Sequence, residues 1–136
     1  MQLKIMTFNL RVHVESDGDN AWPNRAEAVA ETIRKHDPDI IGVQEGLRGM
    51  LADLETLLPE YGWVGEGRDG GTEGEYSAIF YKKDKWEVVE SGNFSLSEHP
   101  ERLGAISWNS SHARMCTWAA FRSGEGGQLA LFNTHL

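Results

Sequence analysis

Five polar residues in this chain stand at the ends of predicted strands, where side chains can meet and do chemistry. Asn9 and Glu45 each close a run of strand-forming residues, and His135 closes another. Glu75 comes just before a predicted strand, and Arg114 stands at the start of one. Because the sites of α/β sheets assemble at strand ends, these five side chains are the candidate functional residues.

Glu45 ends the segment DIIGVQE, which is mostly apolar. A carboxylate that leaves a buried strand is costly to desolvate unless it is paired or bound to a metal ion. Mg²⁺ takes one or two carboxylates and keeps several waters, so Glu45 could be a magnesium ligand. The sequence equally allows an exposed strand-end glutamate or a cap for the helix that follows.

Glu75 and His135 are candidates for a carboxylate–imidazole pair. Such a carboxylate fixes the tautomer of the imidazole and stabilises its charged form, as acid–base catalysis requires. Taken alone, His135 is better explained as a surface histidine at a frayed terminus. Arg114 could bind a phosphate bidentately or form a surface ion pair. Asn9 could be a turn residue that satisfies local backbone groups.

The elements that must position these residues begin as β-α-β-α. Strand formers fill residues 3–11, and a loop rich in Asp, Gly and Asn follows over 12–22. Apolar stripes of helical spacing predict helices over 23–36 and 47–58. The continuous apolar run of 39–45 predicts a strand buried on both faces, as in a parallel sheet. This order indicates an α/β fold.

From residue 60 on, helical spacing is absent and strands dominate. Five further strands are predicted, over residues 62–67, 76–83, 86–96, 113–121 and 129–136. The irregular stretch 97–112 is long for a loop inside a domain, and we expect it to shape a substrate pocket. Trp108 and Trp118 are expected to be packing residues.

Composition excludes several classes of protein. The net charge of −8 argues against non-specific coating of nucleic acid, which needs Lys and Arg to neutralise phosphates, although a nucleic-acid substrate stays possible. No stretch approaches the roughly 18 apolar residues of a membrane span, so no membrane partner is expected. With Cys116 as the single cysteine, no disulfide can form within the chain, which favours a reducing, cytoplasmic location.

Five short motifs, in this order and spacing, resemble the first half of the endonuclease/exonuclease/phosphatase family of metal-dependent phosphoesterases, which includes deoxyribonuclease I: KIMTFNLR, DIIGVQE, GEYSAIFYKK, ARMCTWAAF and LFNTHL. The resemblance implies that Asn9 and Glu45 bind a catalytic Mg²⁺ or Mn²⁺, with Asn9 also near the phosphate. It implies that His135 is the first catalytic histidine and Glu75 its acidic partner. It also makes Arg114 the arginine that contacts the substrate phosphate.

The resemblance further implies a four-layered α/β/β/α sandwich, of which this chain would form one half with a helix-covered mixed β-sheet. The GDFN and Ser-Asp-His motifs of the family's second half do not occur here. We therefore expect residues 1–136 to be the N-terminal part of one domain, with the C-terminal half absent and phosphoesterase activity weak or lost. The alternative is a non-catalytic fragment or self-assembling half-domain.

The expected partners are a phosphoester substrate, whose chemical class the sequence does not show, and a protein that covers an exposed sheet. With half of the sandwich present, the inner face of the sheet would be apolar and open, and monomers seldom expose large apolar patches. A second copy of the chain or a separate C-terminal half would cover it.

Overall fold

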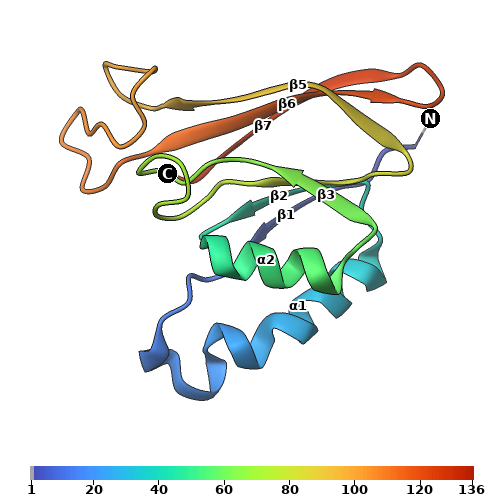
Figure 1. Ribbon diagram of the computed structural model, residues 1–136, viewed down its shortest axis with the longest axis horizontal. Coiled ribbons are helices and arrows are strands. Elements are labelled where there is room, and N and C mark those ends of the chain that lie inside the picture. The colour runs from blue at the N-terminus through green and yellow to red at the C-terminus, as the bar shows by residue number, and fades with distance from the viewer. Residues whose placement is uncertain (1) are drawn as a thin grey trace.

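Two β-sheets pack face to face, and two helices cover the outer side of one of them (Figure 1). This computed structural model describes residues 2–136. The four-stranded sheet has the order β1-β2-β4-β3 and is made of Ile5–Asn9, Ile40–Gln44, Ile79–Lys82 and Tyr61–Val64. The three-stranded sheet has the order β5-β6-β7 and is made of Trp86–Ser95, Met115–Ser123 and Gln128–Thr134. The layers are those of one half of an α/β/β/α sandwich, as expected.

The four-stranded sheet is mixed. β1 and β2 are parallel, with Asn9 opposite Gln44, whereas β4 runs antiparallel to both β2 and β3. All five residues of β2 are buried, which confirms the prediction from its apolar run. The parallel register brings the end of β1 beside Glu45, the residue that follows β2.

The helices form where the apolar stripes predict them. Helix α1 spans Trp22–His36, with Pro23 in its first turn, and helix α2 spans Arg48–Leu57. Their buried side chains form one core with the outer side of the four-stranded sheet, including Ile33, Leu51 and Phe80. The chain leaves α1 through Asp37 in the left-handed conformation (φ 51°), and Pro38 prevents continuation.

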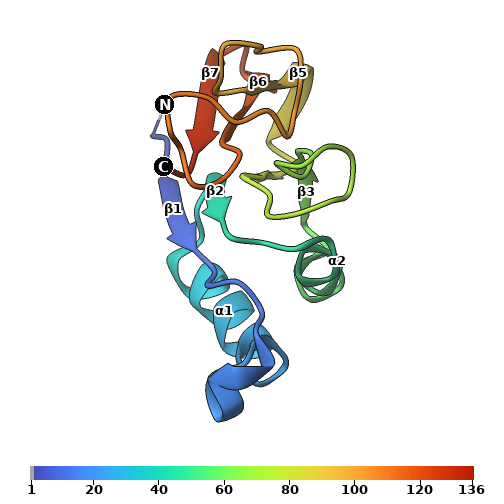
Figure 2. The same cartoon turned by 90° about the vertical axis from the view of Figure 1, so that its left-hand side faces the viewer.

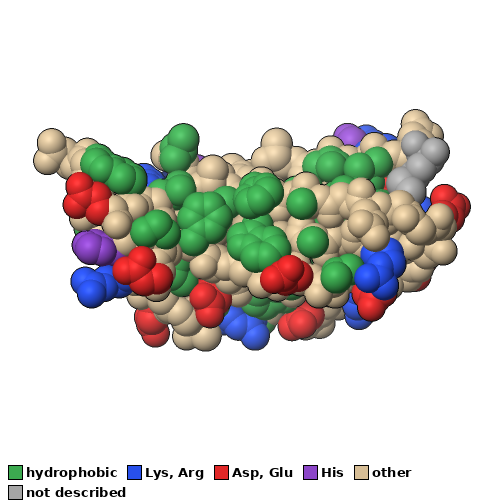
Figure 3. Space-filling model, turned by 90° about the horizontal axis from the view of Figure 1, so that it is seen from above, with side chains coloured by type: hydrophobic (Ala, Val, Ile, Leu, Met, Phe, Trp, Pro, Cys, Tyr) green, Lys and Arg blue, Asp and Glu red, His purple; other side chains and the backbone are tan. Residues whose placement is uncertain are grey.

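A second core lies between the sheets, because the residues of β2 alternate. Ile41 packs toward the helices, while Ile40 meets Phe121 of the other sheet. The expectation of an open inner face is therefore wrong for β2 and β4, which β5-β6-β7 covers, whereas Ile5 on the inner face of the edge strand β1 is 50% exposed. A larger open apolar surface is the outer face of the three-stranded sheet, where Trp118 stacks on Phe132 (Figure 3).

Several predicted boundaries differ from the structure. The expected loop 12–22 contains a short 3₁₀ helix, η1, over Glu15–Asn20. Strand β7 ends at Thr134, so His135 follows the strand instead of lying in it.

Trp108 is 69% exposed and is not a packing residue, contrary to the expectation from the sequence. Over residues 2–136, no helix combines the length and apolar character that crossing a membrane requires.

Candidate active site

Four of the five candidate residues meet at one end of the sandwich, and the fifth lines the same pocket. The Nδ2 of Asn9 donates a hydrogen bond to Oε2 of Glu45 at 2.6 Å. The Nε2 of His135 lies 3.8 Å from that same Oε2, and its Nδ1 lies 4.0 Å from Oε1 of Glu75. Arg114 lines a small pocket together with these two glutamates and His135.

Each of these residues comes from the end or beginning of a different strand. Asn9 ends β1, Glu45 follows β2 and His135 follows β7. Glu75 precedes β4, and its neighbour Tyr76 pairs through its backbone with Gly46. Strand pairing within the four-stranded sheet, and the packing of the three-stranded sheet against it, therefore bring together segments that are as much as 126 residues apart in the sequence, from Asn9 to His135.

Glu45 has a strained, left-handed backbone conformation. Its φ is 63°, in the left-handed region that a residue with a Cβ rarely adopts, and such conformations cost about 1–3 kcal/mol and cluster at functional sites. Two hydrogen bonds to the carboxylate hold it, one from Asn9 and one from the backbone N–H of Val12 at 3.1 Å. The neighbouring carbonyl of Gln44 accepts from the N–H of Leu10 at 3.0 Å.

The carboxylate of Glu45 is stabilised in its charged form. Partial burial by itself would raise the pKa of Glu45, but the hydrogen bonds from Asn9 and Val12 lower it, and nearby His135 and Arg11 lower it further. The net effect is a pKa below the ordinary value for glutamate. The Glu45 side chain is 19% exposed, so an ionised carboxylate faces the pocket with limited access to water.

The residues fit a hard divalent cation that retains water. Glu45 offers an ionised carboxylate, and Asn9 offers an amide oxygen that accepts one N–H, from Arg11 at 2.8 Å. Within residues 2–136, no cluster of three or more His, Cys, Asp or Glu side chains could hold a metal alone. Mg²⁺ and Mn²⁺ suit such a donor set, because Mg²⁺ in particular binds through one or two carboxylates and completes its shell with water and substrate oxygens.

Arg68 is a site residue that the sequence reasoning missed. Its guanidinium lies 3.4 Å from Oε2 of Glu75, on the side of the carboxylate away from the contact with His135, and its side chain is 16% exposed. Arg68 belongs to the glycine-rich loop GRDGGTEGE. Nothing in that sequence indicates which of its charged side chains points into the pocket. Arg68 and Arg114 thus both line the pocket around His135.

Two loops close this end of the molecule. The loop 97–112 lies at the same end of the sandwich as the C-terminus (Figure 1). Its Gly104 packs against the backbone of Asp69 in the glycine-rich loop, since an ideal Cβ there would lie 3.4 Å from the Asp69 carbonyl oxygen. The expectation that 97–112 shapes a substrate pocket stays a prediction.

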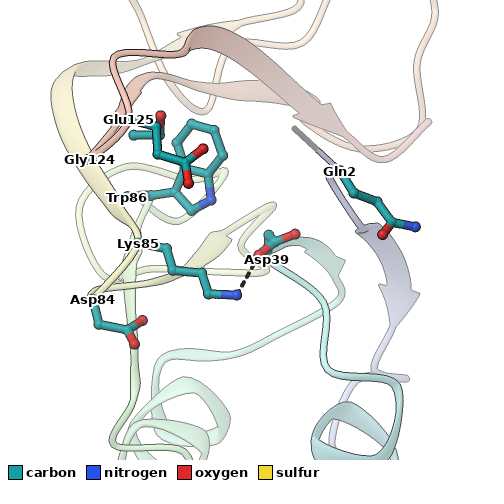
Figure 4. Close-up of a pocket in the computed structure, with 8 residues that line it drawn as sticks. Gln2, Asp39, Asp84, Lys85, Trp86, Gly124 and Glu125 are labelled. Carbon is teal, nitrogen blue, oxygen red and sulfur yellow. Dashed lines mark ion pairs between the residues drawn. The ribbon is translucent and has the colours of Figure 1, made fainter.

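A larger cavity than this pocket lies elsewhere, near the turns β4–β5 and β6–β7. It has a volume of about 390 Å³, and Trp86, Asp84 and Glu125 are among its lining residues (Figure 4). The one ion pair drawn across it joins Lys85 to Asp39 at 3.7 Å. The backbone N–H of Lys4 also binds Asp39, so that carboxylate is already satisfied. The cavity holds none of the five candidate residues.

Comparison with known proteins agrees with this geometry. A family model described as the Endonuclease/Exonuclease/phosphatase family matches residues 6–120. A solved endonuclease/exonuclease/phosphatase from Bacteroides vulgatus is 40% identical, with a TM-score of 0.97 over 98% of this chain and 52% of that chain. A mannosyl-6-phosphatase from Bacteroides thetaiotaomicron is 37% identical, with a TM-score of 0.95 over 99% of this chain and 52% of that one.

A more distant structure shows the fold alone. TDP2 from D. rerio, complexed with single-strand DNA product, is 19% identical with a TM-score of 0.76, over 98% of this chain and 46% of that chain. No curated protein sequence matches this chain. The chain spans about half the length of the solved chains that it resembles.

Proposed function

Because this chain belongs to the endonuclease/exonuclease/phosphatase family, we propose that it takes part in the Mg²⁺- or Mn²⁺-dependent hydrolysis of a phosphoester. The observation that carries the proposal is the meeting of Asn9, Glu45 and His135, with Oε2 of Glu45 within 2.6 Å of the amide and 3.8 Å of the imidazole. An amide, an ionised carboxylate and an imidazole at one point are the groups that metal-assisted hydrolysis needs.

In this proposal Glu45 and Asn9 hold the metal ion. When bound, such an ion supplies positive charge to the phosphate oxygens and lowers the pKa of a bound water. The left-handed backbone of Glu45 aims its carboxylate at the pocket, and the hydrogen bond from Val12 fixes it there.

His135 is proposed to hold or move the proton at the phosphate. Its Nδ1 side faces Glu75, so a proton on Nδ1 is favoured and Nε2 is directed to the side of Glu45. Arg68 lies 3.4 Å from the other oxygen of Glu75 and holds that carboxylate beside the imidazole. Arg114 lines the pocket and is proposed to contact a phosphate oxygen.

The proposed substrate is a small phosphomonoester, such as a sugar phosphate. The 37% identity to a mannosyl-6-phosphatase supports this class. The net charge of −8 weighs against a long polyanion, since binding one rests on many phosphate contacts by Lys and Arg. Two arginines beside one histidine suit a terminal phosphate group, which presents several charged oxygens to one small pocket.

The test is hydrolysis and metal binding by the 136-residue chain. Because the chain spans about half of its solved relatives, we expect it to bind Mn²⁺ weakly and to release phosphate from mannose 6-phosphate only slowly. Both properties should be lost in Glu45→Gln. Bis(p-nitrophenyl) phosphate, a diester, serves as the comparison substrate and should be hydrolysed more slowly still.

One result would count against the proposal, and another would count only against the expected weakness of the activity. If wild type and Glu45→Gln bind Mn²⁺ with equal affinity, Glu45 is not a ligand of the metal ion. Efficient hydrolysis by the chain alone, lost in Glu45→Gln, would contradict only the expectation of weak activity.

A second candidate function is a non-catalytic, self-assembling half-domain, and the outer face of the three-stranded sheet favours it. Phe132 is 64% exposed there and Val89 is 51% exposed, which is unusual for side chains of this size. A chain that assembles through this face while neither binding Mn²⁺ nor releasing phosphate would support this candidate over the first.

A further inference from the structure

A buried asparagine connects the three segments that carry Glu45, Glu75 and His135. Asn133 lies on β7, two residues before His135, and is 7% exposed. We infer that Asn133, together with Gln44, is a positioning residue that fixes His135 relative to Glu45 and Glu75. The inference rests on the proposed function, since it concerns the geometry of that same site.

The hydrogen bonds of Asn133 reach across the two sheets. Its Nδ2 donates to the carbonyl of Val43 at 2.8 Å and to that of Ala78 at 3.0 Å. Its Oδ1 accepts from Nε2 of Gln44 at 2.9 Å. All three contacts are buried, so each replaces a lost contact with water and is costly to leave unmade.

These partners are the immediate neighbours of the proposed catalytic residues. Val43 and Gln44 directly precede Glu45, and Ala78 follows Glu75 by three residues. One side chain on the strand of His135 therefore holds the backbone beside each of the two glutamates. Thr134, between Asn133 and His135, is fixed in turn by its hydroxyl, which donates to the carbonyl of Met115 at 2.7 Å.

Gly42 makes room for this contact. A Cβ on Gly42 would lie 2.9 Å from both Cγ and Oδ1 of Asn133, so no larger residue fits while the amide keeps its place. Gln44 is further bound to Oγ1 of Thr7 at 3.1 Å, which extends the connection to β1, the strand that ends in Asn9. Gly42, Gln44 and Asn133 thus form one contact between the two sheets, which we call the sheet-to-sheet lock.

The lock also explains how the strained turn at Glu45 is maintained. A left-handed φ persists when the surrounding structure over-determines it. Gln44 is held from three sides by Thr7, Asn133 and the carbonyl of Gly42, so the chain enters the turn from a fixed point. Without that anchor we expect Glu45 to sample other backbone conformations.

The test compares Asn133→Ala with the double variant Gly42→Ala/Asn133→Ala. The new methyl group at position 42 enters the space that the asparagine leaves, so the double variant recovers packing and Tm without recovering the hydrogen bonds. Gln44→Met, which keeps the length of the side chain, is a second variant that leaves Asn133 untouched. Asn93→Ala is the control, because Asn93 accepts from the hydroxyl of Thr117 at 2.8 Å and from the N–H of Glu66 at 3.2 Å, and its side chain makes no hydrogen bond to Val43, Gln44 or Ala78.

The main measurement is ¹⁵N relaxation dispersion of metal-free protein at the amides of Glu45, Glu75 and His135. We expect flat profiles in wild type and Asn93→Ala, and microsecond-to-millisecond exchange at all three in the double variant and in Gln44→Met. In turnover assays kcat should fall on the order of 10–100-fold, as for outer-shell residues of metal sites, with little change in KM.

Flat profiles in the double variant and in Gln44→Met would overturn the inference. If the profiles behave as expected but the wild type neither binds Mn²⁺ nor releases phosphate, the lock stands and the proposed function fails. A fall in Tm without exchange at these amides would show that Asn133 serves stability alone.

Discussion

Glu45 is the residue on which the proposed chemistry depends most, because it supplies the one ionised carboxylate of the proposed metal site. We expect Glu45→Gln to weaken Mn²⁺ binding by about tenfold or more, since a neutral amide replaces the charge that a hard cation prefers. Calorimetric titration with Mn²⁺ measures this directly. Glu55→Gln, on an exposed position of α2, is the matched control and should leave the affinity unchanged.

The lowered pKa of Glu45 makes a prediction about acid stability. A carboxylate whose pKa is lower in the folded protein stabilises the fold fully above its unfolded pKa, about 4.3, and this contribution is lost as the pH falls through the folded pKa. In metal-free buffer, wild type should therefore lose more free energy of unfolding below pH 4 than Glu45→Gln does. Urea unfolding of the two proteins from neutral to acidic pH measures the difference, and parallel curves would contradict the assignment.

The segment after β1 is an element whose position depends on one arginine of α1. The guanidinium of Arg25 donates to the carbonyls of Leu10 at 2.9 Å, Arg11 at 3.1 Å and Asn20 at 2.6 Å. The backbone N–H groups of Arg11 and Val12 in turn bind Asn9 and Glu45. The helix thus fixes the loop that holds the proposed metal ligands.

Arg25→Met should therefore affect both stability and metal binding. We expect a loss of about 1–3 kcal/mol in the free energy of unfolding, because the partly buried carbonyl of Leu10 and the exposed carbonyl of Arg11 lose a charged donor. We also expect a several-fold weaker affinity for Mn²⁺. Arg34→Met is the control, since Arg34 lies on the same helix and donates to Leu57 at 3.0 Å, away from the site. An equal loss of Mn²⁺ affinity in both variants would contradict the role of Arg25.

Elements with a strong local pattern could be predicted from the sequence. The stripe of α1 and the buried run of β2 are local signals, and both elements form within one residue of the predicted boundaries. The left-handed φ of Glu45 and the 3₁₀ turn over Glu15–Asn20 have no such signal, because they depend on hydrogen bonds from distant or irregular segments.

The contacts between elements could not be predicted in the same way. Arg68 reaches Glu75 through the path of a glycine-rich loop, and Asn133 reaches Gln44 across 89 positions of sequence. Neither contact has a spacing that marks it, because the two sheets approach each other through tertiary packing. The inner face of the four-stranded sheet was expected to be open for the same reason. The sequence shows which residues are apolar, but it does not show which apolar faces pack against each other.

At the scale of the whole molecule, the distribution of apolar surface is uneven. The apolar sides of the helices and the inner faces of the central strands are buried, with Ile5 on edge strand β1 half exposed. In contrast, an apolar patch that includes Trp118 and Phe132 lies open on the outer face of β5-β6-β7 (Figure 3). The edge strand β7 borders this face and lies on the same side of the molecule as β1, the edge strand of the other sheet (Figure 2). An apolar face next to free strand edges is the arrangement that promotes association.

We propose that two copies of the isolated chain associate through this outer face. A twofold pair would place the same patch of each copy against the other and remove Phe132 from water. Each copy carries a net charge of −8, so we expect the dimer to weaken at low salt, where like charges repel over a longer range. Light scattering after size exclusion at micromolar concentration measures the mass.

Phe132→Lys should shift that dimer to monomer, because it places a charge in the centre of the contact. Trp108→Lys is the control, since Trp108 is equally exposed but belongs to the loop 97–112 and not to the sheet face. A wild-type chain that stays monomeric at high salt would exclude the pair. A dimer that survives Phe132→Lys would move the contact to another surface, and the edge strands β1 and β7 would then be the next positions to change.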